Sequence, residues 1–380
     1  MRDKRWSWVA WAAVAAVCVI YAPMAIEYTW RLFNPSAPGL WDRVFAGAVG
    51  DEQALGAGSI HHEQADAYAE NRVLLLFHTT AGGIAILIFA AQFSARFRRN
   101  LRRHRVLGRV GVTLALVGML GAFGYLLAVG PEHTFDGPAF YLQLWALALG
   151  TLIGVIGGFA TALRRQIAMH RSLMAYAFAL LLTAPLLRIE YVLLGVLWSG
   201  TTQVETNLAG GATLATLAPL GAILASRAMA GRDRRSPTVR PLPGRNLDRA
   251  VGIAALATLP LLVLRYTETF DGTDRITIAG MCTMLAGLAA AATNAAAARK
   301  AGKDVAAEEW RVHTLAFVAS VPAMLLLWLA YDAPFTTGEA FFGALLTAPA
   351  VTLSMGLLLV VWRRRTVVIP QSDQPKVLPI

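Results

Sequence analysis

Charged residues are scarce in this chain. They make up only 15% of its 380 residues, whereas hydrophobic residues make up 56%. Soluble proteins carry about a quarter charged residues, so the composition excludes an ordinary soluble domain. Lysine is rarer still, because 30 of the 34 cationic residues are arginines.

Cysteine and the common catalytic motifs are also rare or missing. The two cysteines, Cys18 and Cys282, lie in apolar stretches without a CxxC pattern, so we expect them to be buried packing residues. The stretch His61-His62-Glu63 lacks the further ligands that a metal site needs. No Walker loop, HExxH, GxSxG or CxxCH motif occurs. ATP-driven transport powered by this chain itself, zincin proteolysis and c-type haem are therefore excluded.

The chain instead contains about ten apolar runs, each near the length of a membrane-crossing helix. The two-residue alternation of an outer-membrane barrel is absent. The sequence predicts an all-α integral membrane protein with about ten transmembrane helices. These are expected at residues 7–27, 72–94, 108–130, 139–162, 172–197, 207–228, 248–267, 275–297, 311–331 and 338–362. We interpret the first run as a retained helix rather than a secretory signal.

The arginines are concentrated in alternate loops. With ten spans, all the basic clusters fall on the same side as the N-terminus, while the opposite loops are acidic, including the long outer segment 28–71. Positively charged loops stay in the cytoplasm. We therefore expect cytoplasmic N and C termini and a bacterial inner (cytoplasmic) membrane location.

The net charge of +11 has a membrane explanation as well. The cations sit in short loops beside apolar spans, where they set topology and meet anionic lipid headgroups. A nucleic-acid protein would place them on a soluble face. The expected partners are therefore the lipid bilayer and its anionic headgroups, with no nucleic acid; the oligomeric state stays open.

We predict five parts along the chain. The fourth is a candidate degenerate repeat of the second to fifth helices, since Trp310-Arg311-Val312-His313 opens its third helix much as His170-Arg171 opens the fifth helix of the chain. The parts are a first helix with outer loop (1–71), a five-helix bundle (72–228), a cytoplasmic linker (229–247), a four-helix bundle (248–365) and a cytoplasmic tail (366–380).

Ionisable residues inside the spans are the first candidates for a site. His78 and Arg188 are expected roughly 9 Å and 15 Å below the outer surface, followed by Glu190 nearer to it. A charge near the bilayer centre costs roughly 2.5–3.5 kcal/mol. In one interpretation Arg188 binds a carboxylate, propionate or quinone oxygen, and His78 relays a proton or ligates a metal or haem iron. In the other, Arg188 pairs with Glu190 or Glu27, and His78 bonds a backbone carbonyl.

Two His-Arg pairs mark the inner ends of two spans. His104-Arg105, with Arg109 close behind, enters the third span, and His170-Arg171 enters the fifth. Three interpretations stay open: anchoring to lipid phosphate, binding of an anion, and ligation of one haem by two imidazoles. Apart from this alternative and the possible ligation by His78, no metal site is predicted.

Glycines recur on one face of the fourth span at Gly150, Gly154 and Gly158. A face without side chains predicts close approach of another helix. We expect it to meet a second set on the third span, namely Gly118, Gly121 and Gly124.

Several of these motifs occur together in one order and spacing. They are His78 with Gly82-Gly83, Gln92-Phe93 ahead of Arg96, His104-Arg105 with Gly108-Arg109, Trp145, His170-Arg171 with Met174, and Arg188. In this respect residues 72–197 resemble the bacterial predicted membrane protein family called domain of unknown function 2306. Leu173 and Tyr176 depart from its usual tryptophan and arginine. The resemblance implies no established reaction, and its four-helix layout is similar to di-haem cytochrome b-type proteins only at the level of fold.

The sequence thus predicts a redox-associated membrane protein that binds haem b or a quinone among its second to fifth helices. The alternatives are a proton-coupled transporter of a small or lipidic molecule and a non-catalytic assembly partner. Whether the protein is an enzyme is left open. Among the histidines, only His78 lies clearly inside a span, whereas a bis-histidine haem needs two. This counts against the haem more than against a quinone or transport.

Overall fold

The computed structural model describes residues 2–31, 33–34, 37–198, 200–229 and 244–364. These residues form helices joined by turns, and no strand occurs among them. Within the described ranges, ten helical segments are long and apolar enough to cross a membrane. This confirms the predicted all-α multi-pass class.

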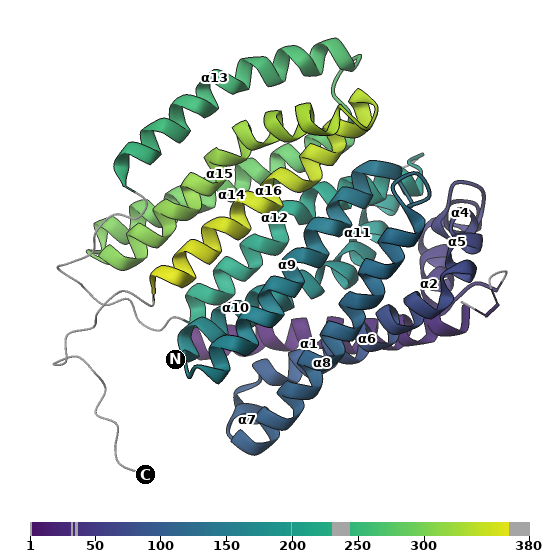
Figure 1. The fold of residues 1–380 in the computed structure, drawn as a ribbon, viewed down its shortest axis with the longest axis horizontal. Helices are drawn as coiled ribbons and strands as arrows, with labels where there is room; N and C mark the ends of the chain where they lie inside the picture. Colours follow the sequence, from purple (N-terminus) through teal and green to yellow (C-terminus); the bar gives the residue numbers. More distant parts are fainter. Residues whose placement is uncertain (1, 32, 35–36, 199, 230–243, 365–380) are drawn as a thin grey trace.

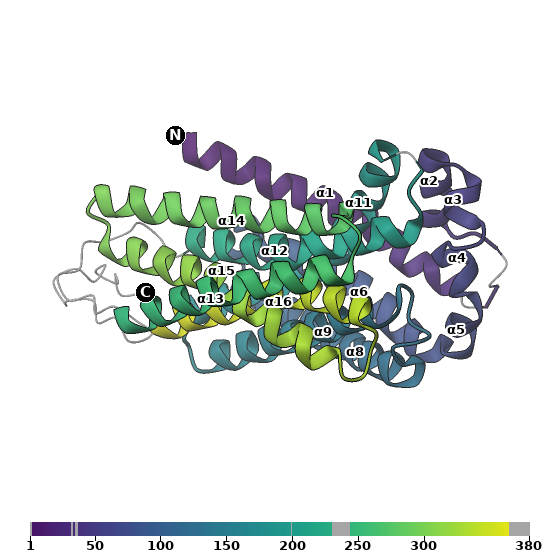
Figure 2. The same ribbon diagram turned by 90° about the horizontal axis from the view of Figure 1, so that it is seen from above.

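The spanning segments lie side by side in one bundle (Figures 1 and 2). Helix α13 lies at the edge of the bundle, where it packs on α15. The bounds are α1 (Arg2–Arg31), α6 (Arg72–Phe93), α8 (Leu101–Val129), α9 (Gly137–Leu163), α10 (Ile167–Leu181), α11 (Thr183–Leu197), α12 (Gln203–Met229), α13 (Arg245–Thr269), α14 (Arg275–Lys300), α15 (Asp304–Tyr331) and α16 (Thr337–Arg363).

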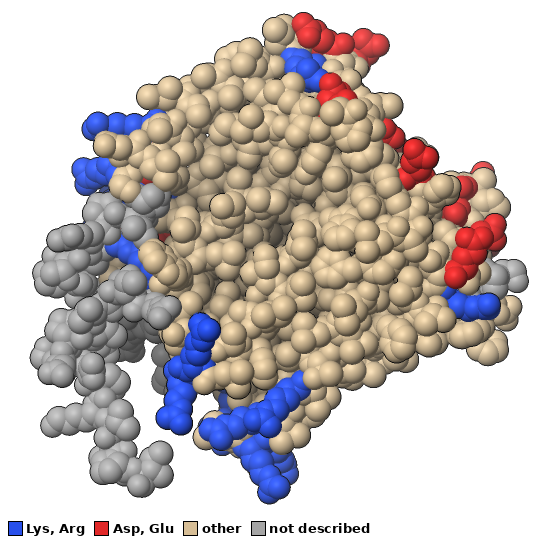
Figure 3. All heavy atoms as spheres, in the orientation of Figure 1, with Lys and Arg blue, Asp and Glu red and all other residues tan. Residues whose placement is uncertain are grey.

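The two ends of the bundle differ in charge. Helix α1 begins and α16 ends at the same end (Figure 1). On the face in Figure 3, Lys and Arg gather at this end, and Asp and Glu gather mainly at the other. We call the basic end the inner end and the acidic end the outer end. That the inner end faces the cytoplasm stays a prediction.

Short helices cover the outer end (Figure 1). Phe45 is almost fully buried and stacks on Trp41, whose ring centroid is 5.7 Å away. The outer segment therefore caps the bundle. The cap consists of α2 (Leu40–Val49), α3 (Asp51–Leu55), α4 (Ile60–Glu63) and α5 (Ala65–Glu70), and one further short helix, α7 (Ala95–Arg98), lies at the inner end.

The two predicted bundles share a hydrophobic core. Tyr176 and Ile223 of the first pack in one buried cluster with Phe317 and Leu353 of the second. Most of the predicted linker, residues 230–243, and the whole tail, 366–380, lie outside the described residues. The division into parts and the internal repeat stay predictions.

Two helices begin seven residues earlier than predicted. Helix α8 starts at Leu101 rather than 108, because the Asn100 side chain accepts a hydrogen bond from the Arg103 backbone nitrogen (3.0 Å) and caps it. Helix α15 starts at Asp304 rather than 311, with an acidic first turn that suits the positive end of the helix dipole. His104 and Arg105 are thus helical, and His313 lies more than two turns inside α15.

The predicted fifth span, 172–197, is two helices rather than one. Helix α10 ends at Leu181, and α11 begins at Thr183. Pro185 has no N–H, and its ring crowds the carbonyl four residues earlier, which is that of Leu181. The Thr183 hydroxyl donates to the Leu180 carbonyl (2.6 Å) at the break. This break sets the direction of the segment that carries Arg188.

Glycine contacts confirm one packing prediction and correct another. A Cβ at Gly158 would lie 2.5 Å from the Met174 sulfur, so α9 and α10 approach closely, as the glycine face predicts. The glycines of α8 do not face α9, because a Cβ at Gly121 would lie 2.5 Å from the Leu74 carbonyl oxygen of α6.

The two cysteines differ. Cys18 is buried, as predicted. Cys282 is exposed, so the prediction was wrong there, because its face of α14 turns away from the bundle.

Candidate functional site

A cavity of about 500 Å³ lies inside the bundle. It begins beneath the outer cap, where Trp41 and Ile60 line it, and reaches the middle of the spans at Thr151 and Ser354. Helices α1, α6, α8, α9, α10, α11, α12 and α16 all contribute to its wall.

The cavity reaches the outside of the bundle half-way along α9 and α16. Leu149 and Ile153 of α9, with Val351 and Met355 of α16, line it, yet each is between 42% and 60% exposed. Figure 3 shows this face hollowed near its centre. Because this depth corresponds to the hydrocarbon layer, the opening connects the cavity to acyl chains rather than to water.

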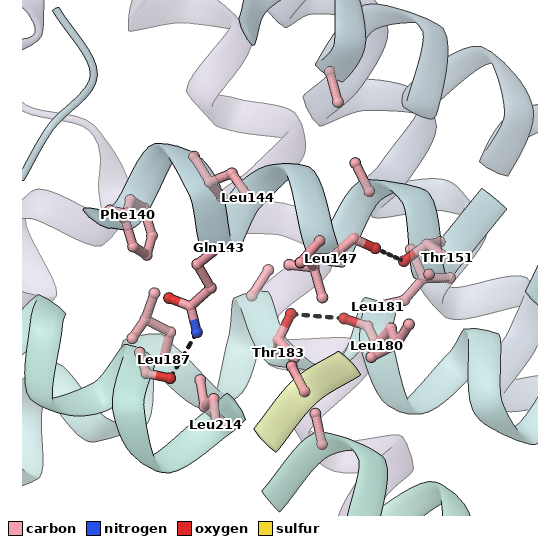
Figure 4. A pocket seen from close by; sticks show the side chains of 18 of the residues that line it. Phe140, Gln143, Leu144, Leu147, Thr151, Leu180, Leu181, Thr183, Leu187 and Leu214 are labelled. Atoms are coloured by element: carbon pink, nitrogen blue, oxygen red, sulfur yellow. Dashed lines mark hydrogen bonds between the residues drawn. The ribbon is translucent and has the colours of Figure 1, made fainter. Parts of the chain in front are cut away.

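Most polar groups of the wall are already hydrogen-bonded (Figure 4). The hydroxyls of Thr151 and Thr183 donate to carbonyls of Leu147 and Leu180, one turn back in the chain. The Gln143 amide donates to the Gly211 carbonyl (2.6 Å). The wall around them is leucine-rich, so this part of the cavity suits an apolar chain.

Arg188 supplies a charge on this wall. Its guanidinium lies over the rings of Trp41 and Tyr191, 5.8 Å and 5.4 Å from their centroids. It makes no hydrogen bond or ion pair with any described residue. Glu27 instead accepts a hydrogen bond from the Leu40 backbone nitrogen, and Glu190 accepts one from Thr213 (both 2.9 Å). The alternative in which Arg188 pairs with Glu27 or Glu190 is therefore absent from the structure.

Tyrosines surround the guanidinium. Tyr21, Tyr28 and Tyr68 lie close enough to Arg188 to interact with it electrostatically, and all three line the cavity. Sequence reasoning missed this ring because its members come from α1, α5 and α11, and only the folded bundle brings them together. Their hydroxyls and the guanidinium make the outer end of the cavity polar.

His78 lines the same cavity from α6. Its Nδ1 lies 3.0 Å from the Gly118 carbonyl oxygen of α8, the backbone contact that one interpretation predicts. A carbonyl oxygen only accepts, so Nδ1 carries the hydrogen and Nε2 of the neutral ring is an acceptor. Nε2 makes no hydrogen bond to the described residues.

A buried polar chain supports the outer end of the site. The Tyr191 hydroxyl donates to Asn207, whose amide donates to Asp136. Burial raises the pKa of Asp136 well above its ordinary value, and the Asn207 hydrogen bond offsets part of that rise. Asp136 lies between two spans and holds, through Asn207, the ring that packs on Arg188.

Glu190, the third predicted pocket residue, does not line the cavity. It contacts α12, where the Thr213 hydroxyl donates to one carboxylate oxygen; its other carboxylate oxygen is buried without a hydrogen bond to the described residues. Of the three candidates, the structure brings together His78 and Arg188.

The candidates at the inner end fall into two groups. His104 and His170 face one another, with ring centroids 6.5 Å apart and planes inclined at 78°. Arg105, Arg109 and Arg171 are exposed. Over the described ranges, no group of three or more His, Cys, Asp or Glu side chains is placed to hold a metal ion.

An ion-pair network at the inner end escaped the sequence reasoning. Glu309 of α15 is paired with Arg227 of α12 and with Arg364, which also donates to the hydroxyls of Ser172 and Ser226 (3.1 and 2.8 Å). The network ties α10 and α12 to α15 and α16. The spans predicted from apolar length could not reveal this network, because the predicted span 311–331 begins after Glu309.

His313 lies one turn beyond this network. It is 1% exposed, and neither ring nitrogen has a hydrogen-bond partner among the described residues. Predicted to open a helix, it is instead among the most buried polar side chains of the described structure.

Residues 75–224 match the family model described as "Predicted membrane protein (DUF2306)". This confirms the resemblance and extends its end from residue 197 into α12. The DUF2306 region carries both His78 and Arg188, whereas α1, the outer cap and α16, which also line the cavity, lie outside it. No curated protein and no solved structure matches the chain.

Proposed function

We propose that this membrane protein binds a lipid-soluble molecule of the quinone class, with the headgroup at Arg188 and the tail in the apolar part of the cavity. One observation carries the proposal. Arg188, an arginine without a carboxylate partner among the described residues, stands at the end of an apolar cavity that opens to the hydrocarbon layer.

Electrostatics indicates that Arg188 has a ligand. Arg188 is half-buried. An isolated charge that is fully buried costs several kcal/mol, a half-buried one costs part of that, and cation–π contacts return only about 0.5–2 kcal/mol. A ligand oxygen hydrogen-bonded to the guanidinium would supply the missing interaction. His78 Nε2 would accept a hydrogen bond from a hydroxyl on the same headgroup, so the pair suits a group that both accepts and donates.

The opening of the cavity at the side of the bundle is the reason to propose a lipid-soluble ligand. A molecule that enters between α9 and α16 never leaves the membrane, and its tail stays among side chains such as Leu147, Leu180 and Leu214. Carboxylate-headed lipids share this chemistry and are the nearest competitors for the site. We further propose a bacterial inner-membrane location with both termini in the cytoplasm.

Binding of a short-tailed quinone to the detergent-purified protein tests the proposal. Losing one charge-assisted hydrogen bond costs about 1.5–3 kcal/mol, so we expect Arg188→Gln to weaken binding by at least tenfold. The matched control is Arg109→Gln, on the exposed face of α8 outside the cavity, and it should bind like the wild type. Equal affinity of wild type and Arg188→Gln would refute the site.

The visible spectrum distinguishes the haem alternative. His78 is the one imidazole that the described residues contribute to the cavity. A Soret band that disappears in His78→Ala would assign the cavity to haem b and contradict quinone binding. Quinone or quinol in an organic extract of the purified protein would support quinone binding.

A carrier for the same lipid-soluble molecule is the second candidate. The observation in its favour is an asymmetry: the outer half holds the cavity, while the Arg227–Glu309–Arg364 network closes the inner end. Carriers expose a site to one side at a time. Vesicle uptake that Arg188→Ala leaves unchanged would count against this candidate.

A further inference from the structure

A second cluster of cationic groups lies at the inner end of α7, α8 and α10, and none of its members lines the cavity. Its members, which we call the inner basic cluster, are Arg98, His104, Arg105, His170 and Arg171. The two imidazoles face one another at 6.5 Å, and Arg98 and Arg105 lie close enough to His104 to interact with it electrostatically.

The structure holds these groups close together. Arg98 donates to the Phe93 carbonyl (2.7 Å), which fixes its guanidinium at the inner end of α6. Burial and the nearby Arg171 guanidinium both lower the pKa of Arg98. Two like charges held within electrostatic range are destabilising unless something of opposite charge joins them.

Among the described residues, no carboxylate pairs with an arginine of this cluster. The sequence contains no Asp or Glu at 71–131 or 137–189, the stretches that form α6 to α10 and the first half of α11. None of Arg98, Arg105 and Arg171 forms an ion pair within the described ranges. The neighbouring inner network differs, because Glu308 and Glu309 there neutralise arginines.

The imidazoles supply unused polar atoms to the same place. His170 Nδ1 lies 2.8 Å from the Gly158 carbonyl, so it carries the hydrogen and Nε2 is left for another partner. His104 Nδ1 is buried and has no hydrogen bond within the described structure. This second observation, independent of the arginines, also indicates that a group is missing from the cluster.

We propose that the inner basic cluster binds a phosphate-bearing anion between His104 and His170. Arginine forks match phosphate oxygens, and protonated imidazoles add donors at the same point. A divalent cation is disfavoured by the three guanidiniums and the lack of carboxylates. The cluster lies at the inner ends of the spans, where headgroup phosphates are found, so a lipid headgroup is the expected source of the phosphate.

Native mass spectrometry of the full chain in detergent, titrated with phosphatidylglycerol, tests this proposal. We expect Arg98→Gln/Arg171→Gln to weaken binding by at least tenfold. The matched control, Arg99→Gln/Arg102→Gln, removes the same charge from exposed arginines of the adjoining turn and should retain most of the affinity. If the glutamine pair does not fold, Arg98→Lys/Arg171→Lys keeps the charge and should bind more weakly than wild type.

The same experiment distinguishes a soluble phosphate from the phosphate of a lipid headgroup. Competition by millimolar inorganic phosphate would support the site with a soluble anion, whereas phosphatidylglycerol binding without such competition would support a lipid headgroup. Equal lipid affinity in wild type and in both Arg98/Arg171 variants would overturn the proposal. So would a Soret band that requires His104 and His170, because the imidazoles would then be haem ligands. Neither result depends on Arg188 or the cavity.

Discussion

Arg188 and Arg265 make a natural comparison at the scale of single residues. Each guanidinium lies over an aromatic ring, Trp41 or Trp328. Of the two, only Arg265 has a carboxylate partner within the described structure, Asp332 at 2.6 Å. The structure thus distinguishes an arginine with a structural counter-ion from one that lacks it.

The comparison gives a stability prediction for the ligand-free protein. Arg188→Met removes an uncompensated charge, so we expect the free energy of unfolding to rise by about 1 kcal/mol or more. Arg265→Met should lower it, because Asp332 would lose its partner. Thermal unfolding of delipidated samples measures both. A fall for Arg188→Met as large as that for Arg265→Met would show that Arg188 is structural.

Asp136 gives a pH prediction with a definite sign. Its pKa is raised in the folded protein, so the folded state binds the proton more tightly than the unfolded state does. Its contribution to stability is therefore complete below the ordinary carboxyl pKa and is lost as pH rises toward the raised pKa, by at most about 1.4 kcal/mol per pH unit.

Asp136→Asn removes this titration and suits the left-handed backbone there (φ 62°). We expect the melting temperature of the wild type to fall, relative to the variant, as the pH rises above the ordinary carboxyl pKa. Parallel curves for the two proteins would contradict the assignment.

At this scale the sequence predicted part of the site. Depth along the spans indicated that His78 and Arg188 share the outer half, and both line one cavity. The tyrosines could not be found, since an interfacial tyrosine is common and nothing in the sequence joins α1, α5 and α11. Glu190 was misplaced because sequence position gives its depth but not its helix face.

At the scale of elements, helix packing depends on a few glycines. A Cβ at Gly121 of α8 would lie 2.5 Å from the Leu74 carbonyl oxygen and 2.9 Å from the His78 nitrogen. Both are backbone atoms and cannot turn aside as a flexible side chain can. At Gly82 of α6, nothing lies within 4 Å of the corresponding position.

We therefore expect Gly121→Ala to destabilise the protein by about 1–3 kcal/mol and to displace His78. Gly82→Ala should be neutral or stabilising by up to about 1 kcal/mol, since alanine favours a helix. Unfolding midpoints measured in one detergent compare the two variants. Equal effects would show that α6 and α8 are less closely packed than described.

The number and order of spans followed from apolar length, but helix starts did not. Charged residues such as Glu308 and Arg103 end a hydropathy window although the helix continues through them. In α15, Glu308 is accommodated by ion pairs with Arg311 and with Arg363 of α16. Partners on another helix are known only from the fold. The break before Pro185 was foreseeable from proline chemistry, although the apolar run conceals it.

At the scale of the whole molecule, the inner network joins α10 and α12 to the C-terminal helices α15 and α16. Glu309 is buried between Arg227 and Arg364. Glu309→Gln would remove the carboxylate charge that both guanidiniums contact. Breaking a buried pair on one side costs about 3–5 kcal/mol.

Asp332→Asn is the matched control, because its pair with Arg265 is partly exposed and should contribute only about 1 kcal/mol or less. Chemical unfolding of both variants tests whether the network holds the two parts together. Similar losses in the two proteins would show that it does not.

The orientation of the chain in the membrane can be tested as well. An even number of spans places both termini on the basic side, which should be the cytoplasm. Alkaline phosphatase fused after Ile380 should be inactive, and a fusion in the outer loop near residue 57 should be active. The reverse pattern would invert the topology and place the cavity mouth and outer cap on the cytoplasmic side.

Arg188 should bind an oxygen-bearing headgroup of a molecule that enters the cavity from the lipid. Cryo-electron microscopy of the protein in nanodiscs of native lipid tests it most directly. We predict elongated density with its polar end at the Arg188 guanidinium and its tail toward the gap between α9 and α16. A cavity holding only water, with Arg188 paired to a carboxylate of the protein, would contradict the claim.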